Sequence, residues 1–261
     1  MIKLIASDLD GTLLRDGAMQ VSARAIQLIE QLQKKGIIFV AASGRQYSNL
    51  YKLFGNASKE MGFLCENGAL VMYQDQILYK SAMEHNLAME LCHTIYNKDD
   101  CEVLASGQDT SYLLPKSEEY RHRIQHIVQN NVAIVERFED IPEDLIKISV
   151  YEKAGIEDHS GPYLINLFKE SAKCTISGFH WLDFVNPDVN KGVALSRLLS
   201  HLSISPSETM AFGDNYNDLE MLSFVGFGYA MQHAADPIKK HCSYECSLVE
   251  DTLEFLLHSL E

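Results

Sequence analysis

The sequence has no long hydrophobic run and few cysteines. The longest apolar run near its N-terminus, residues 37–42, is too short to cross a bilayer, and Asp8 and Asp10 interrupt the single stretch that resembles a signal-peptide core. Six cysteines are scattered along 261 residues, without the density or short pairings of a disulfide scaffold. We therefore expect a cytoplasmic protein with reduced thiols and no membrane partner.

Positive charge is also scarce. Lysine and arginine number 22 against 36 aspartates and glutamates, which gives a formal net charge of −14. A field of that sign repels polyanions, so nucleic acid is not an expected partner, although a small anion can bind through local positive groups. Apolar residues make up 46% of the chain and charged residues 22%, as in folded globular proteins, and the length predicts one large domain or two modest ones.

Hydrophobic periodicity predicts an α/β layer at both ends of the chain. Near the N-terminus, a strand-like run is followed by apolar residues at helical spacing (25, 28, 29 and 32) and then by a continuous apolar run, which together form a βαβ unit. The same alternation returns late in the sequence. The predicted elements are strands at 2–7, 37–42, 209–212 and 225–230, and helices at 22–35, 191–202 and 218–224.

The middle of the chain has a different pattern. A hairpin is predicted at 69–73 and 76–80, and it is followed by mixed helices and strands. The predicted helices lie near 86–97, 117–129 and 160–172, and the predicted strands near 110–114, 145–151, 173–177 and 181–185. We expect residues 1–82 and 186–261 to form an α/β core on a Rossmann-like parallel sheet, with residues 83–185 inserted as an α+β domain.

Polar side chains gather where the predicted core strands end and core helices begin. They lie in four segments, at 8–12, 43–45, 190–192 and 213–218. Because ligands of open parallel sheets sit at the carboxyl ends of strands, we expect these segments to meet. Their carboxylates suit Mg²⁺, and a lysine with backbone amides suits phosphate oxygens. Turn and cap chemistry explains each segment alone, but not all four in this order.

As a set, these segments closely match the motifs of a known family. The motifs are DLDGTLL (8–14), AASGR (41–45), CENGA (65–69), NKGVAL (190–195) and FGDNYNDLEML (212–222). With them the chain resembles the haloacid dehalogenase superfamily of phosphohydrolases, and specifically its Cof-type branch. The resemblance implies a catalytic core at 1–82 and 186–261 and a cap domain at 83–185.

The resemblance also implies the catalytic and metal-binding residues. Asp8 is the expected nucleophile and Asp10 the general acid and base. Mg²⁺ would be held by the Asp8 carboxylate, the Asp10 main-chain carbonyl and Asp214. Asp218 is expected to position Lys191 or a metal-bound water. Bound Mg²⁺ and Lys191 would keep Asp8 ionised.

Five residues are expected to bind the phosphoryl oxygens of the substrate. They are Leu9, through its amide, Ser43, Gly44, again through its amide, Lys191 and Asn217. One segment departs from the family pattern: the chain reads MQHA at 231–234 where the family usually has MGNA. This departure affects the expected shape of that turn and no catalytic group.

Three functions are compatible with these residues. The first is a Mg²⁺-dependent phosphatase that hydrolyses small phosphate monoesters, such as sugar phosphates, through an aspartyl-phosphate. The second is a phosphomutase on the same scaffold, and the third is a phospho-acceptor signalling module. Asp10 argues against the signalling module, because a switch that keeps its phosphoryl group needs no general acid and base beside the nucleophile. The physiological substrate and the oligomeric state stay open.

Overall fold

The computed structural model describes residues 1–260, which form two compact units. Residues 1–79 and 190–260 make up the first, here the core unit, and Lys80–Val189 make up the second, here the inserted unit. The boundaries expected from the sequence, at 82/83 and 185/186, lie a few residues inside those of the inserted unit.

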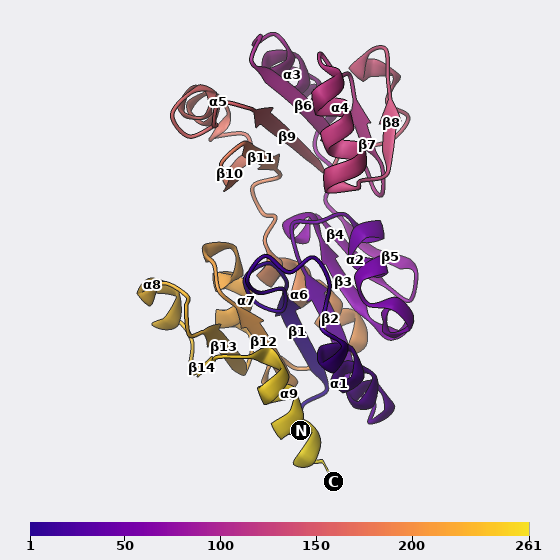
Figure 1. Cartoon of the computed structure of the whole chain (residues 1–261), viewed down its shortest axis with the longest axis vertical. Coiled ribbons are helices and arrows are strands. Elements are labelled where there is room, and N and C mark those ends of the chain that lie inside the picture. The colour runs from indigo at the N-terminus through magenta and orange to yellow at the C-terminus, as the bar shows by residue number, and fades with distance from the viewer. Residues whose placement is uncertain (261) are drawn as a thin grey trace. The chain divides into compact units, whose positions relative to one another are not determined.

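The core unit is built on an eight-stranded sheet in the order β14-β13-β12-β1-β2-β3-β4-β5 (Figure 1). The strands from β14 to β3 run parallel, and β4 is antiparallel to β3. The strands are Leu4–Asp8 (β1), Ile38–Ala42 (β2), Gly62–Cys65 (β3), Leu70–Tyr73 (β4), Gln76–Lys80 (β5), Thr209–Gly213 (β12), Phe227–Met231 (β13) and Tyr244–Cys246 (β14).

Helices of the core unit follow the predicted amphipathic spacing. In α1, the buried residues Ala25, Leu28, Ile29 and Leu32 form one stripe, and the Ser22 hydroxyl caps the helix by accepting from the Ala25 N–H. The helices are Ala23–Lys34 (α1), Tyr47–Leu53 (α2), Lys191–Leu202 (α6), Leu219–Phe224 (α7), Asp236–Lys239 (α8) and Val249–His258 (α9), with short 3₁₀ turns that include Glu66–Gly68 (η2) and Tyr216–Asp218 (η6).

Strand register brings the polar segments to one edge of this sheet. Ser7 is paired with Phe212 of β12, and Asp8 is paired with Ala42 of β2. Every residue of β1 and β12 is buried, as expected for central parallel strands that are covered on both faces. The three strands therefore end side by side, and the residues that follow them share the carboxyl edge.

The inserted unit contains a six-stranded sheet in the order β10-β11-β9-β6-β7-β8, antiparallel except between β7 and β8. Its main apolar core joins α3 and α5 to β6, β9 and β11. The elements are His85–Tyr96 (α3), Cys101–Ser106 (β6), Ser111–Leu113 (β7), Glu118–His122 (α4), Arg123–Val128 (η3, a π-helical segment), Val132–Ile134 (β8), Lys147–Glu152 (β9), Ser160–Phe168 (α5), Lys173–Gly178 (β10) and Trp181–Val185 (β11).

The structure confirms the predicted α/β class and adds elements that the sequence analysis missed. The additions are β3, β6, β8, β14, α2, α8 and α9. In β6, the buried Glu102 hid the apolar character of the run; its carboxylate accepts from the N–H groups of Lys116 and Ser117 at the start of α4. None of the helices within residues 1–260 is long and apolar enough to cross a membrane.

Candidate active site

Lys191 lies at the centre of the carboxyl edge of the core sheet. It is the first residue of α6, and the Asn190 side chain caps that helix by accepting from the Val193 N–H. Its fully buried ammonium lies 2.5 Å from Asp8 Oδ1 and 2.6 Å from Asp218 Oδ1. One cation thus joins the last residue of β1 to η6, and two carboxylates compensate its buried charge.

Burial and charge act in opposite directions on this group. Burial raises the pKa of Asp8 to about 7, while Lys191 acts to lower it. For Lys191, burial acts to lower the pKa, but Asp218 and Asp8 outweigh it and raise the pKa above its usual value, so the lysine stays charged. With Lys191 alone beside it, Asp8 therefore keeps a raised pKa, and a second positive charge nearby would lower that pKa.

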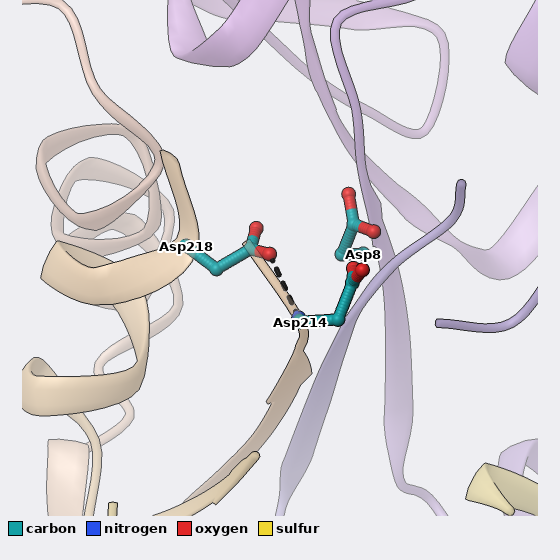
Figure 2. A group of neighbouring side chains, drawn as sticks. All are labelled: Asp8, Asp214 and Asp218. Atoms are coloured by element: carbon teal, nitrogen blue, oxygen red, sulfur yellow. Dashed lines mark hydrogen bonds between the residues drawn. The ribbon is translucent and has the colours of Figure 1, made fainter. Parts of the chain in front are cut away.

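Three aspartates offer oxygen ligands for such a charge. Carboxylate oxygens of Asp8, Asp214 and Asp218 all lie within 4.8 Å of one another. Figure 2 shows these side chains at the end of β1 and after β12. Both carboxylate oxygens of Asp218 already accept hydrogen bonds. Its Oδ1 accepts from Lys191, and its Oδ2 accepts from the N–H groups of Asp214 and Asn215, each at 3.1 Å. Asp8 and Asp214 are the remaining candidates for carboxylate ligands, and oxygen ligands suit Mg²⁺.

Three further residues hold Asp214. The Thr12 hydroxyl donates to its Oδ1 at 2.9 Å, and the His233 ring Nε2 lies 3.6 Å from its Oδ2. Gly11 has a φ of +94°, and a Cβ there would lie 2.3 Å from the same Oδ2, so only glycine fits beside this carboxylate. Burial raises the pKa of Asp214, and the Thr12 bond and His233 act to lower it.

Neither Thr12 nor His233 was assigned a role from the sequence. Thr12 lies inside the quoted DLDGTLL motif, so that motif was the available signal. His233 lies in the 231–234 turn, where the chain departs from the family pattern. That turn reaches the candidate metal ligand Asp214 through the His233 ring.

Asp10 lies outside the buried cluster. Its side chain is 58% exposed and forms a bidentate pair with Arg45, at 3.0 Å from Nε to Oδ2 and 2.5 Å from Nη2 to Oδ1. In this arrangement the carboxylate only accepts hydrogen bonds. Arg45, quoted above as part of AASGR and given no role, is thus the direct partner of the predicted general acid and base.

The predicted phosphoryl-binding residues belong to the same edge of the core unit. Ser43 is buried directly after β2, and Leu9 is buried directly after β1. Asn217 lies in η6, and its Nδ2 donates to Asn67 Oδ1 at 3.1 Å. The Asn67 side chain also borders Gly44, since a Cβ at Gly44 would lie 3.2 Å from its Nδ2.

Comparisons with known proteins agree with this fold. A family model described as haloacid dehalogenase-like hydrolase matches residues 5–252. The 5-amino-6-(5-phospho-D-ribitylamino)uracil phosphatase YbjI of Escherichia coli is 27% identical over 247 residues, which cover 93% of this chain and 90% of that protein. The HMP-PP phosphatase of Serratia proteamaculans is 27% identical over 252 residues, with 92% and 87% covered.

Solved structures extend the likeness to the whole fold. A crystal structure of a protein from Eubacterium rectale is 28% identical, has a TM-score of 0.89, and covers 98% of this chain and 99% of that one. With a family model over most of its length, the chain belongs to the haloacid dehalogenase-like hydrolases. The Cof-type resemblance inferred from the motifs is confirmed.

Proposed function

We propose that this hydrolase is a Mg²⁺-dependent phosphatase that cleaves small phosphate monoesters through an aspartyl-phosphate. The observation that carries the proposal is the buried Asp8–Lys191–Asp218 group beside Asp214. A carboxylate at a strand end, paired with a buried cation and next to a second carboxylate, suits attack on a phosphoryl group beside a divalent metal. The phosphatases among its relatives support a phosphoric monoester hydrolase.

Asp8 supplies the nucleophile. Its carboxylate attacks phosphorus, the ester P–O bond breaks, and the phosphoryl group is transferred to Asp8. Asp10 gives its proton to the leaving alcohol and then takes one from the water that attacks the aspartyl-phosphate, which releases inorganic phosphate and restores Asp8. Asp10 must leave Arg45 for these transfers, because the bidentate pair occupies its carboxylate.

Asp8, Asp214 and the main-chain carbonyl of Asp10 are the proposed Mg²⁺ ligands. When bound, the ion neutralises charge on the phosphoryl oxygens and on Asp8. The raised pKa of Asp8, a result of burial, supports this part of the proposal, because it leaves the carboxyl in need of a second cation. Asp218 is assigned to holding Lys191 in place, because its Oδ1 accepts from that ammonium.

Five groups hold the phosphoryl oxygens. They are the Lys191 ammonium, the Ser43 hydroxyl, the Asn217 carboxamide and the amides of Leu9 and Gly44. Donors fixed by the fold stabilise the charge on the transferred group without reorganising, and phosphoryl transfer relies mainly on such positioning.

The substrate class is small phosphorylated metabolites, sugar phosphates among them. The Escherichia coli relative is named for a substrate that carries its phosphate on a ribitylamino group. Residues 83–185 act as the cap that selects the leaving group, since every proposed catalytic group lies outside them.

A screen of phosphorylated metabolites, with detection of released phosphate, tests the proposal. Purified protein with Mg²⁺ should release phosphate from several sugar phosphates, and Asp8→Asn should abolish the release. Analysis of the organic product separates hydrolysis from a mutase reaction, in which an isomeric ester appears and free phosphate does not. A screen with no phosphate release, or an active Asp8→Asn protein, would overturn the proposal.

A further inference from the structure

The CENGA motif forms a turn with an uncommon backbone. After β3, three consecutive residues have positive φ angles: 51° at Glu66, 57° at Asn67 and 101° at Gly68. Asparagine and glycine tolerate this left-handed region, but glutamate does not favour it. Backbone of this kind persists only where its surroundings hold it, and it is concentrated at functional sites.

Two neighbouring segments hold the turn. The Asn67 N–H donates to the Ser43 carbonyl at 3.0 Å, and the Glu66 N–H donates to the Arg45 carbonyl at 3.2 Å. On its other side the turn packs against the start of α6, since a Cβ on Gly68 would lie 2.5 Å from the Asn190 carbonyl. The turn therefore sits between the loop that follows β2 and the helix that begins with Lys191.

The Asn67 side chain reaches two of the proposed phosphoryl-binding positions. Its Oδ1 accepts from Asn217 Nδ2 at 3.1 Å, across 150 residues of sequence. Its amide atoms would lie 3.2 and 3.3 Å from a Cβ placed on Gly44. One half-buried carboxamide thus links η6 to the loop that follows β2.

We propose that Asn67 is a positioning residue that fixes the carboxamide of Asn217 for phosphoryl binding; this inference rests on the proposed function. A free carboxamide can turn over and present its oxygen to an anion. The hydrogen bond from Asn217 Nδ2 to Asn67 Oδ1 favours the orientation of the Asn217 amide in which its nitrogen lies toward Asn67. The second hydrogen on that nitrogen can then donate to a phosphoryl oxygen. The amide does not have to reorient when phosphate binds, so no free energy is lost to reorganisation.

The test uses Asn67→Gly, which removes the side chain while the backbone keeps its left-handed angle. With the Mg²⁺-loaded protein and inorganic phosphate as the probe, we expect calorimetric phosphate affinity and kcat/KM each to fall roughly 3- to 10-fold, the loss of one hydrogen bond. Gln74→Gly is the matched control. It replaces an exposed residue of the same unit that also has a positive φ, 49°, and it should leave both quantities unchanged.

A double-mutant cycle with Asn217→Ala distinguishes positioning from general damage. If Asn67 acts through Asn217, the double variant binds phosphate no more weakly than Asn217→Ala alone. Asn67→Ala, which adds backbone strain, should melt below Asn67→Gly and bind phosphate equally well. Additive losses in the cycle, or unchanged phosphate affinity in Asn67→Gly, would overturn the inference about Asn67. If the wild type is active in that case, the proposed function still holds. A wild type that neither binds phosphate nor hydrolyses esters would overturn both.

Discussion

Lys191 and Asp218 form a fully buried ion pair, with 2.6 Å between Nζ and Oδ1, and the same Nζ reaches Asp8. The pair fixes the position of the ammonium that donates to Asp8 Oδ1. Because neither partner is exposed, loss of Lys191 leaves the buried Asp218 carboxylate without its cation.

Lys191→Met therefore tests the stability of this group. We expect the free energy of unfolding at pH 8 to fall by about 3–5 kcal/mol, since two carboxylates lose their buried cation. The loss should be smaller at pH 5, where Asp8, whose pKa burial raises, takes up a proton and the uncompensated charge is reduced. Urea unfolding at the two pH values measures this loss in the free energy of unfolding. An equal loss at both pH values would contradict the charges assigned to Lys191 and its two carboxylate partners.

Asp8→Asn should reduce hydrolysis to background while the protein stays folded, because a carboxamide cannot form the aspartyl-phosphate. Because burial raises the pKa of Asp8, this carboxyl binds more proton in the folded than in the unfolded state between about pH 4 and pH 7. The contribution of Asp8 to the stability of the metal-free wild type should therefore fall as the pH rises through that window. The variant should lose less stability, which melting curves at pH 5 and pH 8 would reveal; identical pH dependence would argue against a buried, titrating Asp8.

Asp10→Asn should depend on the leaving group. Loss of a general acid typically costs about 10²–10⁴-fold, and we expect a loss of that size for alkyl phosphates. Nitrophenyl phosphate needs little protonation of its leaving group, so its loss should be much smaller. Steady-state kcat/KM values for the two substrates provide the comparison, and equal losses would rule out the acid role.

Metal removal should abolish activity, and Mg²⁺ should restore it. Calcium, with its larger ligand number, should bind without supporting turnover. Protons compete with the metal for Asp8, so the Mg²⁺ concentration for half-maximal activity should rise as the pH falls from 8 to 6. Asp214→Asn should raise the Mg²⁺ concentration for half-maximal activity further at every pH. Full activity in excess chelator would contradict the proposed site.

Local patterns were sufficient for much of the fold. The apolar stripe of α1 and the two-sided burial of β1 follow from residue spacing that is visible in the chain. The prediction failed at β6, where Glu102 is satisfied by backbone N–H groups of Lys116 and Ser117 that no local pattern ties to it. It also failed at β14, which has only three residues.

For the candidate site too, local motifs predicted one part and the tertiary structure decided the other. The sequence by itself was enough to select Asp8, Asp10, Lys191 and Asp214 as candidates, because they belong to short motifs; their catalytic roles stay predictions. Only the tertiary structure decided which side chains are hydrogen-bond partners: Arg45 with Asp10, Thr12 with Asp214, and Asn67 with Asn217. These partners are separated by 35, 202 and 150 residues, and the register of parallel strands, not the spacing along the chain, brings them within hydrogen-bond distance.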